Sequence, residues 1–152
     1  MPIRIVTNSP QETIAAAEKL GSLLKRGDMI AYKGGLGAGK TTFTRGLAQG
    51  LGLGDCVSSP TFALVNEYAG EDLTLYHFDM YRIASEDELE TTGFYDYDFS
   101  NNIAAVEWSE NIPFALPKDT IYITINTLGD TEREILIEEG GRLAAAWDRY
   151  LR

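Results

Sequence analysis

Residues 34–41 read Gly-Gly-Leu-Gly-Ala-Gly-Lys-Thr, and no other stretch limits the possible folds of this chain as strongly. The order Gly, four residues, Gly, Lys and Ser/Thr is the pattern of a phosphate-binding loop. The apolar run 28–33 before it is typical of a buried strand. After it, apolar side chains recur at the spacing of an amphipathic helix, at Phe43, Leu47 and Leu51. These flanks disfavour the alternative, a glycine-rich turn that binds nothing.

Each part of this loop has a physical task toward a polyphosphate. The glycines let successive backbone N–H groups turn inward around an anion, and the following helix aims its positive end at the same charge. Lys40 is predicted to reach the β- and γ-phosphates, and the Thr41 hydroxyl is predicted to ligate Mg²⁺. The sequence therefore predicts a chain that binds a polyphosphate together with Mg²⁺.

Composition narrows the setting and the partners. The length of 152 residues predicts one domain over 1–152, and 44% hydrophobic residues suffice for a core. A net charge of -10 argues against direct, broad binding to nucleic acid, although a partner can carry the basic surface. Cys56 is the only cysteine, so no intramolecular disulfide partner exists and a cytoplasmic location is expected. We see neither a signal peptide nor an apolar run that could span a membrane.

The rest of the chain alternates strand and helix patterns, which predicts an α/β fold of the phosphate-loop NTPase type. Ser9 and Pro10 should start a helix that Gly27-Asp28 ends, and the helix after the loop should end near 50–54. Residues 57–62 should form a loop. Further strands are predicted at 3–6, 62–68, 73–78, 103–108, 121–126 and 133–138, with a last helix at 143–151. The short turn between 62–68 and 73–78 makes those two antiparallel, so we expect a mixed, mainly parallel central sheet flanked by helices.

Two carboxylates end predicted strands, where open α/β sheets place their ligands. Asp79 follows the strand 73–78 and is the candidate for the Mg²⁺-side carboxylate. Glu107 ends the strand 103–108 and is a second candidate for holding a metal-bound water or orienting the attacking water. The sequence does not decide which carboxylate orients the water. Trp108 either packs on a nucleotide or seals the end of the sheet, and the pattern favours packing.

Other side chains carry weaker signals. Thr61 is placed to sense a γ-phosphate, but a Ser/Thr-rich turn explains it equally well. Arg82 either stabilises phosphate charge or pairs with an acidic neighbour. His77 is interpreted as a strand residue with one hydrogen bond and not as a catalytic base. The aromatic and acidic stretch 93–99 is predicted to be an irregular surface segment that could dock a partner, and the last third of the chain is interpreted as scaffold.

Together these segments resemble the bacterial TsaE family, the ATPases of tRNA threonylcarbamoyladenosine biosynthesis. The resemblance rests on GGLGAGKTT at 34–42, SPTF at 59–62, YHFDMYR at 76–82 and AVEW at 105–108. It implies a small cytoplasmic ATPase that hydrolyses ATP slowly alone and works in a complex with TsaD and TsaB. That complex modifies the adenosine next to the anticodon in tRNAs that read codons beginning with A. The transfer chemistry would belong to TsaD, and this chain would supply a nucleotide-dependent conformational step, contacting tRNA only through the complex.

The resemblance also assigns roles to residues of this sequence. Catalytic roles would fall to Lys40, Asp79 and Glu107, and Mg²⁺ ligation to Thr41, Asp79 and Glu107. ATP would be bound by Thr13, Gly35, Leu36, Gly37, Ala38, Gly39, Lys40, Thr41, Thr42 and Trp108. Ser59, Thr61 and Arg82 would belong to a switch-like segment.

Two other functions are compatible with a phosphate loop. A small-molecule kinase usually closes an arginine-rich lid, whereas Arg82 is the only basic residue between Asp79 and Glu107. A nucleotide-gated binding module would bind ATP and a partner without hydrolysis, so it would not need either carboxylate.

Overall fold

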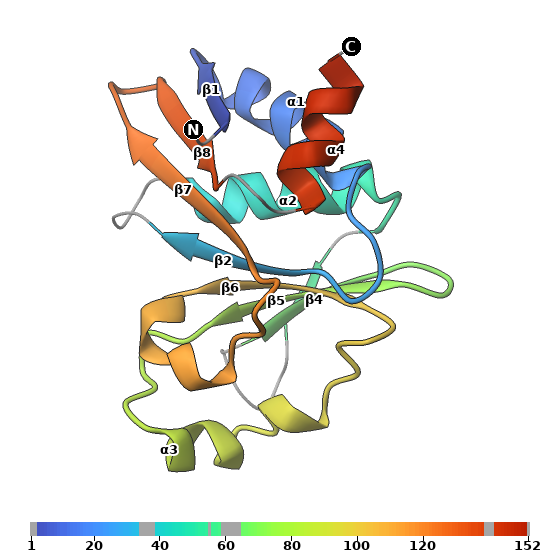
Figure 1. Cartoon of the computed structure of the whole chain (residues 1–152), viewed down its shortest axis with the longest axis vertical. Helices are drawn as coiled ribbons and strands as arrows, with labels where there is room; N and C mark the ends of the chain where they lie inside the picture. Colours follow the sequence, from blue (N-terminus) through green and yellow to red (C-terminus); the bar gives the residue numbers. More distant parts are fainter. Residues whose placement is uncertain (1–2, 34–38, 55, 59–64, 139–141, 152) are drawn as a thin grey trace.

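One eight-stranded mixed sheet organises the part of the chain that the computed structural model describes, residues 3–33, 39–54, 56–58, 65–138 and 142–151 (Figure 1). Its strands lie in the order β1 (Ile3–Thr7), β8 (Arg133–Ile137), β7 (Ile121–Thr127), β2 (Met29–Lys33), β6 (Ile103–Glu107), β5 (Thr74–Asp79), β4 (Val65–Ala69) and β3 (Cys56–Ser58). The central strands β7, β2, β6 and β5 pair in parallel, and only β8 and β4 run against the others. This arrangement confirms the predicted α/β class and mixed sheet.

The centre of the sheet follows directly from the apolar runs in the sequence. In β2 the first four residues are buried, and in β6 the first four are buried as well. Such continuous burial is typical of parallel strands that are covered on both faces. In β7 buried and half-buried residues alternate instead. This strand lies closer to the edge of the sheet, since only β8 and β1 lie beyond it.

The first helix, α1 (Pro10–Gly21), begins where the sequence predicts. The Ser9 side chain accepts a hydrogen bond from the Glu12 N–H at 3.1 Å, and Pro10 occupies the first turn. The helix ends at Gly21, however, and not at Gly27-Asp28 as predicted. Gly21 lies against α2, where an added Cβ would come within 2.3 Å of the Leu47 backbone oxygen, and Ser22 caps the helix with its N–H bonded to the Glu18 oxygen. Residues 22–28 then turn the chain back into β2.

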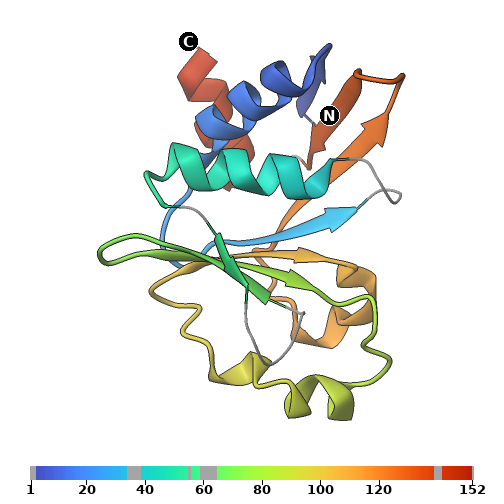
Figure 2. The same ribbon diagram turned by 180° about the vertical axis from the view of Figure 1, so that it is seen from behind.

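Three helices cover one face of the sheet: α1, α2 (Lys40–Gly50) and α4 (Arg142–Leu151) (Figures 1 and 2). The predicted end of α2 near 50–54 is confirmed. The helices bury an aliphatic core against strand residues that include Ile30, Leu75, Ile103, Ile123 and Ile135. We call this side the helical face.

The opposite face carries α3 (Glu86–Thr91) and the short 3₁₀ turns η1 (Phe94–Asp96), η2 (Ser109–Asn111) and η3 (Pro113–Ala115). Here the prediction for 93–99 is wrong in one respect. Phe94 is only 2% exposed, and its ring lies 5.0 Å from Phe78 and 4.9 Å from Phe99. The segment is irregular, but its aromatic side chains build a core, and Tyr95 alone among them is strongly exposed. We call this side the aromatic face.

The edge beyond β4 also differs from the prediction. Cys56–Ser58 form β3, which pairs antiparallel with β4, where the sequence predicted a loop from residue 57. The sequence did not indicate β3, because its pairing partner β4 lies outside the local pattern on which the loop prediction rested. Residues 59–62 lie outside the described part of the chain. No helix among the described residues is long and apolar enough to cross a bilayer.

Candidate functional site

The two candidate carboxylates lie side by side at one edge of the sheet. Asp79 and Glu107 are register partners at the ends of the parallel strands β5 and β6. Side chains alternate between faces along a strand, so each carboxylate shares its face with the residues two and four positions before it. Leu75, Ile103 and Ala105 belong to the helical core. Asp79 and Glu107 therefore both lie on the helical face, where α2 begins.

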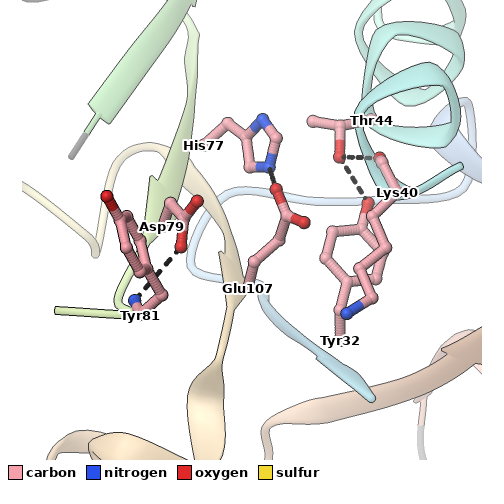
Figure 3. A network of polar contacts seen from close by, with 7 residues as sticks. All are labelled: Tyr32, Lys40, Thr44, His77, Asp79, Tyr81 and Glu107. Atoms are coloured by element: carbon pink, nitrogen blue, oxygen red, sulfur yellow. Dashed lines mark hydrogen bonds and ion pairs between the residues drawn. The ribbon is translucent and has the colours of Figure 1, made fainter. Parts of the chain in front are cut away.

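His77 lies on the same face and contacts one of these carboxylates. Its Nε2 lies 2.6 Å from Oε2 of Glu107 (Figure 3), and the imidazole is only 4% exposed. This confirms the interpretation of His77 as a strand residue with one hydrogen bond. Among the described residues no group bonds its other ring nitrogen, Nδ1. The ring of Tyr32 lies edge-on to the imidazole, with centroids 6.5 Å apart.

A buried hydrogen-bond chain connects strand β2 to the first turn of α2. The Thr44 hydroxyl donates to the backbone oxygen of Lys40 at 2.7 Å, so the Tyr32 hydroxyl, 2.7 Å away, donates to Thr44 (Figure 3). Burial raises the pKa of Tyr32, and the charge of Glu107 raises it further, so the phenol stays protonated and remains a donor. No sequence motif indicates this pair of hydroxyl groups. Its one local signal is the spacing of Thr44, one helical turn after Lys40.

Burial, neighbouring charges and one hydrogen bond all shift the pKa of Asp79 at this edge of the sheet. Its partial burial raises the pKa of the carboxyl, and the negative charge of Glu107 adds to that increase. The Tyr81 N–H, which donates to Asp79 at 3.1 Å, lowers the pKa, as do His77 and Lys40. Two carboxylates thus repel each other beside a lysine, and a divalent cation would relieve that repulsion.

The start of α2 faces this same edge. Gly39 precedes the helix with a φ of 92°, in the left-handed region that suits glycine, and Lys40 is buried in the first turn. Thr41 is exposed and Thr42 is half-buried. The loop residues Gly35, Leu36, Gly37 and Ala38 lie outside the described part of the chain.

A cavity of about 100 Å³ lies beside the start of α2. It is lined by Pro10, Thr13, Gly39, Thr42, Asp130, Thr131 and Arg133. Thr13 is buried, and its hydroxyl lies 2.6 Å from the hydroxyl of Thr7 in β1. A larger cavity of about 310 Å³ near Arg142 lies away from these side chains, and none of the predicted site residues lines it.

The turn between β7 and β8 reaches this cavity, so the last third of the chain, interpreted from the sequence as scaffold, contributes residues beside the start of α2. Arg133 donates to the carbonyls of Gly129 and Glu132 at 3.0 and 2.9 Å, which closes the turn. A Cβ placed on Gly39 would lie 3.9 Å from Nε of Arg133. No local motif announces Arg133, because the fold brings it to Gly39 from more than ninety residues along the chain.

The other predicted residues lie around the site or outside the described chain. Trp108 follows Glu107 with a φ of 58° and packs, half-buried, against the aromatic face. Arg82 is exposed, with its guanidinium 5.1 Å from the centre of the Tyr81 ring. Ser59 and Thr61 lie outside the described residues.

The donor set fits Mg²⁺ held together with a phosphate. Within the described part of the chain, no three His, Cys, Asp or Glu side chains gather as a closed metal site. Magnesium usually takes one or two carboxylates, water and substrate phosphate oxygens instead of an all-protein cage. Asp79, Glu107 and the exposed Thr41 at the start of α2 match that requirement.

Comparison with known proteins assigns the chain to a family. Residues 7–135 match the family described as threonylcarbamoyl adenosine biosynthesis protein TsaE. The chain belongs to the TsaE family. It is 45% identical to the tRNA threonylcarbamoyladenosine biosynthesis protein TsaE of Bacillus subtilis over 129 residues, 85% of this chain and 80% of that protein. The Treponema pallidum protein of the same name is 38% identical over 135 residues, 89% of this chain and 99% of its own.

A solved structure supports the same assignment. The crystal structure of YdiB from Bacillus subtilis superposes with a TM-score of 0.76 at 35% identity, covering 100% of this chain and 97% of that one. The family resemblance drawn from the sequence motifs is thereby confirmed. The TsaE family takes part in the biosynthesis of threonylcarbamoyladenosine in tRNA.

Proposed function

We propose that this protein is an ATPase that binds and slowly hydrolyses ATP with Mg²⁺, and that it thereby supports formation of threonylcarbamoyladenosine in tRNA. The observation that carries the proposal is that Asp79 and Glu107 end neighbouring strands beside Lys40 in the first turn of α2, whose charge acts on Asp79 (Figure 3). A helix N-terminus with a lysine attracts phosphate, and paired carboxylates attract a divalent cation. Phosphoryl transfer to water requires charge neutralisation and positioning of the reactants. Candidate residues for both tasks lie at this one edge of the sheet.

Each side chain has a proposed task. Lys40 and the N–H groups of the loop at 34–41 would bind the β- and γ-phosphates. Thr41, Asp79 and Glu107 would hold Mg²⁺, which would neutralise the charge of the leaving phosphates when bound. Either Asp79 or Glu107 would orient the attacking water. Ser59, Thr61 and Arg82 would respond to the γ-phosphate as a switch-like segment.

The cavity beside Thr13 is suited to the rest of the nucleotide. It opens next to Gly39 and Thr42, which belong to the loop and the helix that would hold the phosphates. Its hydroxyl and carboxylate groups, on Thr13, Thr131 and Asp130, can hydrogen-bond a ribose or a base. Trp108 is the other candidate for contact with ATP, although its packing against the aromatic face favours a role in supporting Glu107.

We further propose that the protein works in the cytoplasm in a complex with TsaB and TsaD, and that it contacts tRNA through that complex. The net charge of -10 supports docking to a protein more than direct binding to a polyanion. In the described chain Arg82 lies over Tyr81, and Arg133, which lies beside Gly39, donates its hydrogen bonds to carbonyls of its own turn. Hydrolysis alone should then be slow, because an arginine supplied by a partner is worth roughly 10³–10⁵ in rate.

The experiment measures threonylcarbamoyladenosine on unmodified tRNA over many turnovers, with TsaB, TsaD, threonylcarbamoyl-adenylate and ATP. We expect sustained turnover with the wild-type protein and a single round or less with Lys40→Ala. The exposed Lys118→Ala variant is the control, because Lys118 lies on a different surface from the start of α2. If neither wild type nor Lys40→Ala changes turnover, the proposal is wrong. Phosphate transfer to a metabolite would instead support a kinase.

A further inference from the structure

His77 is an unusual residue for its position in the sheet. It is the only histidine of the chain and lies 4% exposed within a strand whose flanking residues, Tyr76 and Phe78, belong to the aromatic face. On its own side its neighbours are the Tyr32 ring and the Glu107 carboxylate. An apolar side chain would fill this space without leaving a polar atom unpaired.

The hydrogen bonding of the imidazole fixes its tautomer. An ionised carboxylate only accepts hydrogen bonds, so the 2.6 Å contact requires the proton of His77 on Nε2. Nδ1 is buried and has no partner among the described residues. A buried polar atom without a partner is destabilising, so the imidazole is not explained by its contribution to stability.

The position of Glu107 suggests what the imidazole does instead. The Glu107 side chain is 17% exposed and lies at the end of β6, between His77 on one side and Tyr32 with Lys40 on the other (Figure 3). Without a donor, a glutamate at a strand end has several accessible rotamers. With Oε2 bonded to Nε2, the carboxylate is held in one of them, and no described residue forms a hydrogen bond to its other oxygen, Oε1.

We propose that His77 is a positioning residue that holds the Glu107 carboxylate in the geometry needed for Mg²⁺. This inference rests on the proposed function, because it assigns Glu107 to the metal. His77 acts through one hydrogen bond to the ligand and does not touch substrate or metal. Replacing a residue that hydrogen-bonds to a metal ligand commonly changes metal affinity or activity by about 10- to 100-fold.

Three substitutions separate this role from simple packing. His77→Gln keeps an N–H donor near the position of Nε2, His77→Asn offers a donor only near the position of Nδ1, and His77→Leu offers none. The measurements are the affinity for a fluorescent ADP at varied Mg²⁺, the rate of hydrolysis and the thermal midpoint. We expect Leu and Asn to raise the Mg²⁺ concentration needed for half-maximal effect about 10-fold, with Mg²⁺-free ADP affinity unchanged. His77→Gln should restore it to within a few-fold of wild type.

The single histidine provides a second readout that needs no substitution at His77. In protein labelled with ¹⁵N-histidine and freed of any histidine tag, the imidazole signals belong to His77 alone. We expect one slowly exchanging proton on Nε2, and a change in its chemical shift in Glu107→Gln. Finding the proton on Nδ1 would contradict the proposal.

The positioning role of His77 and the proposed function can fail separately in these measurements. If wild type binds ADP with Mg²⁺ and all three variants match it, His77 has no positioning role and the proposed function stands. If Gln loses as much as Leu, packing of the ring and not its donor is what matters, and the proposal is wrong. If wild type shows no Mg²⁺-dependent nucleotide binding, the proposed function fails, and the positioning role falls with it.

Discussion

The two faces of the sheet are packed by different means. On the helical face, α1 and α2 approach so closely that glycines are needed at their contact, and the core between them and the sheet is mostly aliphatic. On the aromatic face, short and irregular segments contribute rings to a cluster in which Tyr76, Phe78, Phe94, Tyr97 and Phe99 contact one another. Long amphipathic helices cover one side, and a few large rings hold the other.

Because the two faces are packed differently, their stability depends on different residues. Helices distribute burial over many small side chains, so close approach of their backbones matters most. Rings concentrate burial in few residues, and each buried ring removes 150–250 Å² from water. The candidate site lies at the edge of the helical face, next to α2. We therefore expect the fold to be most sensitive to single truncations on the aromatic face and to added atoms on the helical face.

The largest effect is expected from Phe94→Ala on the aromatic face. Phe94 is 2% exposed and contacts the rings of Phe78 and Phe99, so its removal should lower the free energy of unfolding by about 3–5 kcal/mol. The matched control is the adjacent Tyr95→Ala, whose ring is 48% exposed and should cost about 1 kcal/mol or less. Urea denaturation measures both. If Phe94→Ala costs as little as Tyr95→Ala, about 1 kcal/mol or less, then 93–99 is the surface segment that its composition suggests.

A smaller loss is expected from Gly46→Val on the helical face. A Cβ at Gly46 would lie 2.6 Å from the Cβ of Ala17 and 2.9 Å from the backbone oxygen of Ile14, so α1 must move away. Overpacking of this kind typically costs about 1–3 kcal/mol. Gln49→Val places the same residue on the exposed side of α2 and should cost about 0.5 kcal/mol through helix propensity. If the two variants unfold at the same urea concentration, close helix packing does not limit this face.

The helical face was largely predictable because its signals are local. The capping Ser9, the first-turn Pro10 and the apolar run of β2 each predict structure from a few neighbouring residues. The same holds for Asp79 and Glu107, since a carboxylate that ends an apolar strand marks the ligand edge of such a sheet. Their adjacency in register could be expected from the parallel topology.

The other features of the fold and the site could not be predicted, because they depend on contacts between residues that are distant in the sequence. Phe94 lies in a stretch rich in Asp and Tyr, and it belongs to the core because its ring contacts the rings of Phe78 and Phe99. Arg133 reaches Gly39 through the order of strands in the sheet. The bond between His77 and Glu107 requires parallel pairing of β5 and β6 in one particular register, because a shift by one residue would place His77 on the other face.

The smallest expected effect tests the edge where the site lies. Burial raises the pKa of Asp79 above its ordinary 3.8, so between that value and the raised pKa the folded chain binds more protons than the unfolded chain. The contribution of Asp79 to stability therefore falls as pH rises through this window. Asp79→Asn should remove that part of the pH dependence and stabilise the protein slightly at neutral pH, by ~0.5 kcal/mol or less, because solvent still screens this half-buried carboxylate. Thermal unfolding from acidic to neutral pH measures it.

Glu134 provides the matched control because its shift has the opposite sign. Hydrogen bonds from Arg4 and Asn126 lower the pKa of its carboxyl, so its contribution is present above the ordinary pKa and is lost as pH falls through the lowered one. Glu134→Gln should then weaken the protein at neutral pH, whereas Asp79→Asn should not. Loss of stability in Asp79→Asn at neutral pH would mean that Lys40, His77 and the Tyr81 N–H stabilise the ionised carboxylate more than its burial and Glu107 oppose it. The ionised Asp79 carboxylate would then already be stabilised by the residues around it. A bound cation would not be needed to relieve charge repulsion between Asp79 and Glu107.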